Sequence, residues 1–331
     1  MKAAKKTAIQ LTLLASLIST TSAMAADQVT FQLDWLPGGD KAPVYVGIQQ
    51  GFFADEDLEV KIASGRGSTD ALTKMATGQS DIGSSDIGAL MAAKAQDNVP
   101  VVAVYPYFTQ APHAFFVLKS SGIKSIKDLK GKKVATSPFT SSNAFLPLVL
   151  QQNGLSEDDI KLVKSDPGAL APMMITGSTD AIIAWVTNTA LYESQAKGAG
   201  KELIEMPWSS SGLSLYSSSV LASEKFLEER PDVAKRFIKA FAKSIEFTYA
   251  NPDQAGADLH KMVPEVDANI VSAQIKSIYN LVYNDVTTQD GFGNFTDARI
   301  QKTWEYVAQA NGVSVDAIDP TTTVNNSFKP E

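Results

Sequence analysis

Apolar residues recur along this chain with two alternating periods. In residues 29–33 and 58–62 they occupy every second position, which is the period of a half-buried strand. The stretch between them, residues 42–50, is predicted to be a helix because it stops at Gly51, where a helix tends to end. A further helix-like stretch stops at Gly78. Strands and helices that alternate at such short spacing are typical of βαβ units, so we predict a mainly parallel sheet with right-handed crossovers.

The same order of elements restarts after residue 133. Further predicted strands lie at residues 81–83, 101–104, 134–135, 160–163 and 181–184, and further helices at 87–95, 143–152, 169–176, 231–245, 252–262, 268–283 and 297–310. Pro147 conflicts with one of these helices, since a proline past the first turn removes a backbone hydrogen bond. That helix is expected to begin later or to be kinked.

One seven-residue pattern, Met-x-Thr-Gly-x-x-Asp, occurs twice, at residues 75–81 and 174–180. Each copy lies between a helix-like stretch and a short apolar run. We interpret the glycine as the end of the helix and the aspartate as the entry to a strand, so the repeated residues are scaffold. The repeat predicts two related halves with a cleft between them, and it aligns residues 84–86 with residues 183–185.

The first 25 residues have the pattern of a secretory signal. Three lysines precede an interrupted apolar run, and Ala-Met-Ala follows at residues 23–25 as a cleavage site. A cleaved signal is favoured over a membrane anchor because polar residues break the run, and no later segment is apolar enough to span a bilayer. The mature chain is therefore expected to be soluble and exported, with about two domains of roughly 150 residues. With no cysteine, its stability must come from a large core.

Charge and composition exclude several classes of function. Removal of the three signal lysines would lower the net charge from −7 to −10, which argues against nucleic acid and anionic membranes as partners. His113 and His260 lie far apart in sequence, so we expect no metal site of the usual His/Cys kind. No Gly-x-Ser-x-Gly pattern supports a hydrolase triad, and residues 65–68 resemble a phosphate loop only loosely. We expect no cofactor.

Polar and aromatic residues follow the predicted strand ends, where open α/β sheets bind ligands. Asp34 and Trp35 come directly after the first strand, in a turn set by a proline and two glycines. Arg66 precedes a helix N-terminus and offers planar donors to an acidic group. The other candidates are Ser85, Asp86, Phe108, Ser137, Thr140, Ser141 and Trp185.

Trp185 aligns with Asp86 through the repeat. An aromatic wall in one half and a carboxylate in the other would suit a flat ligand with N–H donors. Simpler alternatives remain for three of these residues. Trp35 could pack as a lid over the first helix, Arg66 could pair with Asp70 on the surface, and Trp185 could belong to the core of its half.

The chain resembles the NMT1/THI5-like group, which is close to the sulfonate, taurine and nitrate binding proteins of ABC importers. The resemblance rests on residues 34–37, Tyr45, and residues 51–53, 58–60, 78–83, 128–134 and 222–227, and it covers nearly all of the mature chain. It implies an α/β periplasmic binding protein fold of type II, with two parallel-rich sheets flanked by helices and two crossing hinge strands.

On this pattern the chain divides into a signal peptide and two lobes. The signal peptide is residues 1–25, lobe I is residues 26–115 plus 218–331, and lobe II is residues 116–217. The chain is expected to cross between the lobes near residues 114–118 and to return near residues 213–220.

The eukaryotic branch of this group makes the thiamine pyrimidine from its own histidine and a bound pyridoxal phosphate. Its motif has Asn and His where this chain has Gly38 and Lys41, and Lys where this chain has Ile48. The cysteine-rich motif of that branch also has no counterpart. These departures argue against an enzyme, and they weaken the transfer of pyrimidine specificity.

The resemblance and the candidate residues together predict a periplasmic solute receptor. We expect a monomer that traps a small organic molecule and delivers it to an ABC permease and its ATPase. The expected ligand is aromatic or heterocyclic, and a compound like the thiamine pyrimidine is one candidate. The rival within transport is an alkanesulfonate, taurine or carboxylate ligand, in which case Arg66 and the helix N-termini dominate. The rivals from other classes are an exported enzyme and a sensor module. The identity of the ligand is open at this stage.

Overall fold

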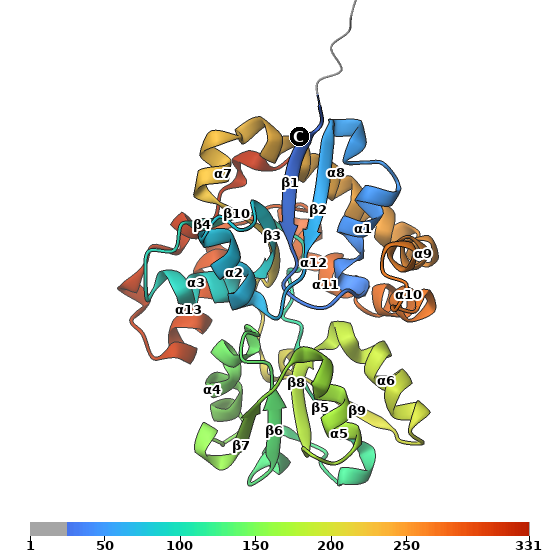
Figure 1. Cartoon of the computed structure of the whole chain (residues 1–331). Coiled ribbons are helices and arrows are strands. Elements are labelled where there is room, and N and C mark those ends of the chain that lie inside the picture. Colours follow the sequence, from blue (N-terminus) through green and yellow to red (C-terminus); the bar gives the residue numbers. More distant parts are fainter. Residues whose placement is uncertain (1–24, 331) are drawn as a thin grey trace, which may run out of the picture.

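The computed structural model describes residues 25–330, so the expected signal peptide lies outside the described residues apart from Ala25. Two five-stranded sheets build two α/β lobes, one above the other in Figure 1. The first sheet has the order β2-β1-β3-β10-β4, and the second has the order β7-β6-β8-β5-β9. The strands are β1 Asp27–Gln32, β2 Leu58–Ala63, β3 Ile82–Asp86, β4 Val101–Pro106, β5 His113–Leu118, β6 Lys133–Thr136, β7 Lys161–Lys164, β8 Ala181–Trp185, β9 Leu203–Pro207 and β10 Ser218–Ser223.

Both sheets are mixed in the same way. In the first, β1 is parallel to β2 and β3, while β10 is antiparallel to β3 and β4. In the second, β6 is parallel to β7 and β8, while β5 is antiparallel to β8 and β9. Each sheet thus contains one reversed strand, which is the first strand that the chain forms after it passes from the other lobe. The predicted two-lobed fold of type II is confirmed.

The chain passes between the sheets over residues 107–112 and returns over residues 208–217. These two segments pair at the hinge, where Ser217 N–H donates to the Phe108 carbonyl (2.9 Å). Next to this contact, Tyr107 N–H donates to the carbonyl of Ser218, the first residue of β10 (3.1 Å). Residues 114–118, expected as the first crossing, lie instead in β5 between β8 and β9. These residues form an unbroken apolar run, which is typical of a strand that is buried on both faces of its sheet. The lobe boundaries themselves stay a prediction.

Helices cover both faces of each sheet (Figure 1). They are α1 Ala42–Gln49, α2 Ser68–Ala76, α3 Ile87–Lys94, α4 Ser142–Gln152, α5 Leu170–Ile175, α6 Thr189–Gly198, α7 Glu224–Glu229, α8 Pro231–Ala250, α9 Pro252–Met262, α10 Ala268–Ser277, α11 Tyr279–Val282, α12 Asp285–Asp290 and α13 Asp297–Asn311. The apolar stripe of α8 packs on the first sheet, with Phe237 stacked against Phe31 at 5.7 Å between ring centroids. Helix α13 packs against α3 of one lobe and α4 of the other, which helps to hold the lobes together.

Most predicted elements are present, with a few differences. Helix α4 runs through Pro147. The predicted helix at residues 268–283 is two helices, α10 and α11, that join at Ile278. Strand β9 and helices α6, α7 and α12 were not predicted from the sequence. Most of β5 was expected only as a crossing strand, and the predicted return crossing overlaps the first residues of β10.

The repeated motif has the same structural role in both lobes. Gly78 and Gly177 follow α2 and α5 with φ of 72° and 77°, a left-handed conformation that glycine adopts without cost. Asp81 then exchanges hydrogen bonds with Thr30 of β1, whose N–H donates to the Asp81 carboxylate (2.7 Å). Asp180 does the same with Lys133 of β6 (2.8 Å). The motif therefore ties a helix end to the start of a neighbouring strand.

We expect Asp81→Ala to lower the free energy of unfolding by about 1–2 kcal/mol, because the Thr30 N–H would lose a charged acceptor in a partly buried place. Asp180→Ala should cost less, since its hydrogen bond is exposed. Urea denaturation of both variants checks this. If Asp81→Ala were as stable as the wild type, the motif would not stabilise the start of the strand.

Candidate ligand-binding site between the lobes

A pocket lies where the carboxyl ends of strands from the two sheets face each other. Its lining residues follow β1, begin α2, precede α4, and end or follow β8. They are Asp34, Trp35, Asp40, Ser68, Thr140, Ala184, Trp185, Thr187 and Asn188. This is the edge at which open α/β sheets bind ligands. Lobe I contributes both acidic residues, Asp34 and Asp40, together with Ser68, and lobe II contributes the neutral polar residues Thr140, Thr187 and Asn188.

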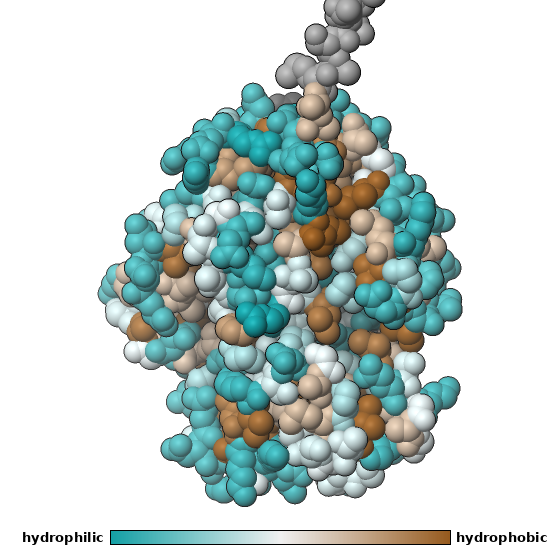
Figure 2. Space-filling model, in the orientation of Figure 1, coloured by the Kyte–Doolittle hydropathy of each residue, from teal (hydrophilic) through white to brown (hydrophobic). Residues whose placement is uncertain are grey.

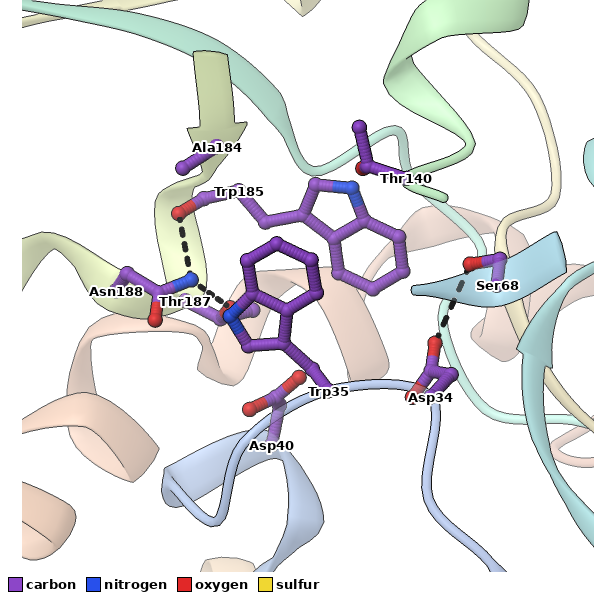
Figure 3. Close-up of a pocket in the computed structure, with 9 residues that line it drawn as sticks. All are labelled: Asp34, Trp35, Asp40, Ser68, Thr140, Ala184, Trp185, Thr187 and Asn188. Atoms are coloured by element: carbon purple, nitrogen blue, oxygen red, sulfur yellow. Dashed lines mark hydrogen bonds between the residues drawn. The ribbon is translucent and has the colours of Figure 1, made fainter. Parts of the chain in front are cut away.

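Two tryptophans form the walls of this pocket. Trp35 projects from lobe I and Trp185 from the end of β8 in lobe II, and Figure 3 shows both indoles at the centre of the site. The cavity has a volume of about 10 Å³, which is room for about one water molecule. Figure 2 shows the lobes in contact across the waist of the molecule. The structure is thus closed, and an organic ligand requires the lobes or the indoles to move apart.

A buried ammonium lies between two carboxylates beside the pocket. Lys41 Nζ is 2.5 Å from Asp34 Oδ1 and 2.9 Å from Asp40 Oδ2, and the Lys41 side chain is 1 % exposed. Burial alone would lower the pKa of Lys41, but the carboxylates of Asp34 and Asp40 outweigh it and hold that pKa well above the ordinary value. Burial also raises the pKa of the Asp40 carboxyl, against the effect of Lys41.

The Lys41 ammonium also reaches across to the other lobe. Its Nζ lies 5.4 Å from the ring centroid of Trp185, within the range of a cation–π contact. Asp34 is further fixed by the Ser84 hydroxyl, which donates to its carboxylate at 2.8 Å. Through these contacts Lys41 fixes the carboxylates of Asp34 and Asp40 relative to the Trp185 ring.

One donor of the pocket has no acceptor among the described residues. Trp185 is 8 % exposed, and its Nε1–H is buried without a hydrogen-bond partner. Figure 3 shows this nitrogen on the side of Thr140. A buried unpaired N–H is costly, so a ligand acceptor at this point would be stabilised.

Behind the pocket, Asp86 at the end of β3 in the first sheet meets His113 at the start of β5 in the second. The Asp86 carboxylate accepts hydrogen bonds from the Ser217 hydroxyl (2.6 Å) and Gly88 N–H (2.7 Å), and its Oδ2 lies 3.7 Å from His113 Nε2. Burial raises the pKa of Asp86 to about 6, and burial lowers the pKa of His113 to about 3. The histidine is therefore neutral at pH 7, and the two residues are packed at the hinge rather than in the pocket.

Asp86→Asn is expected to gain stability relative to the wild type as the pH rises. Because the folded-state pKa of Asp86 is above the ordinary 3.8, its favourable contribution is present below pH 3.8 and is lost as the pH rises through about 6. The full difference is about 3 kcal/mol. Subtracting the unfolding free energies of the wild type and the variant from pH 4 to pH 8 cancels most of the opposite trend from His113. A difference that does not change with pH would contradict the assignment.

A second contact between the lobes closes the cleft at its rim. The Ser137 hydroxyl donates to the Arg66 carbonyl (3.0 Å), and Thr69 N–H donates to the Phe139 carbonyl (3.1 Å). Gly67 lies between them with φ of 154°, and a Cβ on it would be 2.2 Å from the Phe139 oxygen. Only glycine fits this closed contact.

Gly67→Ala should therefore prevent full closure and weaken binding of a ligand held by both lobes, by about 10-fold. Gly51→Ala is the control, because Gly51 also has a positive φ of 77°, but a Cβ added to it would meet no atom within 4 Å. Calorimetric titration of both variants with the ring compound that screening identifies checks the difference. Equal affinities would show that the rim contact does not limit closure.

Comparison with known proteins places this chain in a family. Residues 39–255 match the family described as NMT1/THI5 like. The chain belongs to the NMT1/THI5-like family. This confirms the resemblance seen in the sequence.

The relatives and structural neighbours of this chain have names that point to different functions. The riboflavin-binding protein RibY of Chloroflexus aurantiacus is 25 % identical over 311 residues, covering 92 % of this chain and 86 % of that protein. A 4-amino-5-hydroxymethyl-2-methylpyrimidine phosphate synthase of Candida albicans is 24 % identical over 271 residues, 77 % of each chain. The alkanesulfonate-binding protein SsuA from Xanthomonas axonopodis pv. citri has a similar structure, with a TM-score of 0.72 at 14 % identity, over 92 % of this chain and 99 % of that one. That likeness shows a shared fold.

In this NMT1/THI5-like chain, four of the ten predicted site residues line the pocket, namely Asp34, Trp35, Thr140 and Trp185. Arg66 does not, because its side chain is 58 % exposed and pairs with Asp70 at 3.0 Å. The others lie around the pocket. Ser85 donates to the Ser68 carbonyl, Asp86 and Ser141 lie at the hinge, Phe108 is in the core of lobe I, and Ser137 closes the rim. A ligand contact by any of the ten stays a prediction.

Several pocket residues were missed by sequence reasoning. Asp40 lies in the turn after the first predicted strand and Ser68 at the start of a helix-like stretch, but neither was predicted as a site residue. Thr187 and Asn188 were not considered. The adjacent opposite charges of Asp40 and Lys41 could have signalled a buried pair. No helix in the described part of the chain is long and apolar enough to cross a membrane, and residues 25–330 hold no cluster of His, Cys, Asp or Glu suited to a metal ion.

Proposed function

We propose that this protein is the solute receptor of an ABC importer and captures a flat nitrogen heterocycle between its lobes. The observation that carries the proposal is the pair of tryptophans, Trp35 and Trp185, which come from opposite lobes and line one pocket with the carboxylates of Asp34 and Asp40. Aromatic faces bind a flat ring, and carboxylates accept from its N–H groups. Aminopyrimidines are flat nitrogen heterocycles of this kind.

Each pocket residue then has a role in capture. The indoles of Trp35 and Trp185 hold the two faces of the ring once the lobes have opened and closed again. Asp34 and Asp40 accept from ring or amino N–H groups at one edge. Trp185 Nε1–H and the Thr140 hydroxyl meet an acceptor at another edge. Binding by both lobes would favour the closed form.

A sulfonate or carboxylate ligand is less well supported by this pocket. Its lining includes no arginine or lysine, and Arg66 pairs with Asp70 outside it. Two lining carboxylates would repel an anion. The structural neighbour that binds alkanesulfonates shares the fold at 14 % identity, which does not transfer its ligand. Arg66→Ala separates the two cases, since a loss of affinity for the true ligand would favour an anion.

The enzyme alternative comes from the relative named as a pyrimidine phosphate synthase. The eukaryotic motif has a histidine where this chain has Lys41, and the Lys41 ammonium is held between Asp34 and Asp40. A buried ammonium with a raised pKa cannot serve as the base or as the donor of a pyrimidine ring. This supports a receptor that releases its ligand unchanged.

The setting of this function is also part of the proposal. We place the mature chain in the periplasm as a monomer, delivering its ligand to a membrane permease driven by an ATPase.

A thermal-shift screen tests the proposed function. The panel contains aminopyrimidines, flavins, aromatic acids, alkanesulfonates and polyamines at fixed protein concentration. A compound that binds only the folded state adds about 2.7 kcal/mol at 100 times its Kd. We expect flat nitrogen heterocycles to raise the Tm and sulfonates to leave it unchanged, and the reverse result would overturn the proposal.

A further inference from the structure

The charges around the pocket do not balance. Two carboxylates, Asp34 and Asp40, line the pocket, and one ammonium, Lys41, lies between them. No other cationic side chain among the described residues lines the pocket. The closed site therefore carries one net negative charge when all three groups are ionised.

The excess charge belongs to Asp40 rather than to Asp34. Asp34 is 2.5 Å from Lys41 and accepts from the hydroxyls of Ser84 (2.8 Å) and Ser68 (3.4 Å). Asp40 contacts the same ammonium through Oδ2 at 2.9 Å, and no other side chain of the described residues donates to it. Apart from Lys41, only its own backbone N–H contributes a hydrogen bond to this carboxylate within residues 25–330, so it has capacity left to accept from a ligand. Figure 3 shows the Asp40 carboxylate next to the Trp35 ring.

The remaining ionisable groups near Asp40 do not supply the missing positive charge. They are Lys41, Asp34, Tyr107 and Tyr249. Burial raises the pKa of both tyrosines, so they are neutral at pH 7. Asp86 acts on Asp34 from behind and is a further acid. On the side of α10, the neighbour is the neutral Gln274, which accepts from Gly39 N–H.

The walls of the pocket also suit a cation. Indole faces attract a positive charge placed over them, and a desolvated contact of this kind is a strong one. Trp185 already has Lys41 on its ring at 5.4 Å. The buried and unpaired Nε1–H of Trp185, in a residue that is 8 % exposed, independently marks this pocket as built for a polar ligand.

We propose that the pocket binds its flat heterocycle as a monocation, with the protonated ring or amino nitrogen donating to Asp40. This rests on the proposed function and names the charge state of its ligand. Asp40 is then the specificity-determining residue. Lys41 neutralises Asp34, so one negative charge, that of Asp40, remains for the ligand. A weakly basic heterocycle that is neutral in solution takes one proton from the buffer when it binds, and releases it when it leaves.

The first test compares two flat rings of the same outline. 4-Aminoquinoline is a cation at pH 7, and 1-aminonaphthalene is neutral. By calorimetric titration the wild type should prefer the cation by at least about 10-fold. In Asp40→Asn, which keeps the Asp34–Lys41 pair, this preference should fall by about 10-fold or more. Asp55→Asn is the control, since Asp55 is a 65 % exposed acid paired with Lys243, and it should keep the wild-type preference.

A second readout needs no variant. Titration of the wild type with 4-aminopyrimidine at pH 7.5, in two buffers of different ionisation enthalpy, should show uptake of about one proton per molecule bound. Equal binding of the two rings by the wild type, an unchanged preference in Asp40→Asn, or no proton uptake would each overturn the proposal. If neutral heterocycles from the screen bind but 4-aminoquinoline and 4-aminopyrimidine do not, the charge proposal fails and the receptor stands. If no flat ring compound binds, both fail.

Discussion

Trp185→Ala is expected to weaken binding of the flat heterocycle by about 10- to 100-fold. Stacking of one ring on an aromatic side chain contributes about 1–3 kcal/mol by alanine substitution, and each 1.4 kcal/mol is a factor of ten. Truncation would also remove the Nε1–H that has no acceptor in the described residues, and the ring that Lys41 contacts. Fluorescence or calorimetric titration with the ring compound from the screen measures the change.

Two further variants test whether the tryptophans contact the ligand or only pack within their lobes. Trp185→Phe keeps an aromatic face but loses the N–H, so it should recover most of the stacking and none of the hydrogen bond. Trp35→Ala removes the wall of the other lobe and should weaken binding to a similar extent. If Trp185→Ala bound as well as the wild type, Trp185 would be a packing residue of lobe II, which was the simpler alternative.

Lys41→Met is expected to lower the free energy of unfolding by about 3–5 kcal/mol. Removing one partner of a buried charge pair leaves the other charge desolvated, and here two carboxylates would lose their shared ammonium. The Lys41 side chain is 1 % exposed, with Asp34 and Asp40 2 % and 5 % exposed, so water cannot replace it. Urea denaturation at pH 7, followed by circular dichroism, measures the loss.

Lys239→Met is the matched control for this change. Lys239 also pairs with a carboxylate, that of Glu56 at 2.6 Å, but its side chain is 65 % exposed. Such a surface pair contributes about 0–1 kcal/mol. Adding Asp40→Asn to Lys41→Met should recover part of the stability, because one buried charge is then removed. A loss below about 1 kcal/mol for Lys41→Met alone would contradict a stabilising buried pair.

The lobes could be predicted from the sequence because their elements have clear local signals. The alternation at residues 29–33 and the stripe at Val233, Phe237 and Phe241 depend on neighbours in the chain and on burial of one face. The repeat aligned Asp86 with Trp185, and both are the last residues of equivalent strands. Strand β5 was expected as a crossing between the lobes and not as a strand inside the second sheet, because an unbroken apolar run has no period that would show burial on both faces.

The site was predicted less completely because it depends on contacts between distant segments. Asp34, Trp35, Thr140 and Trp185 could be found since polar and aromatic residues after strand ends are unusual. The adjacent opposite charges of Asp40 and Lys41 indicate an ion pair, but they do not show that Lys41 turns inward to meet Asp34 and so places Asp40 in the site.

Arg66 shows the opposite error. It fits the sequence pattern of an anion site at a helix N-terminus. However, Asp70 is one helical turn away and forms an ion pair with it. Residues such as Ser137 and Gly67 have their role only when the lobes touch. Sequence patterns within one lobe cannot show such a contact.

The most direct test of a receptor for a flat heterocycle is to bind a ligand and recover it. The mature chain would be saturated with the tightest ring compound from the screen, freed of excess by gel filtration and then denatured. Mass spectrometry of the released compound would give its amount and its mass. We predict one molecule per chain with an unchanged mass. A changed mass would show an enzyme, and an empty protein after saturation with every ring compound would contradict the receptor.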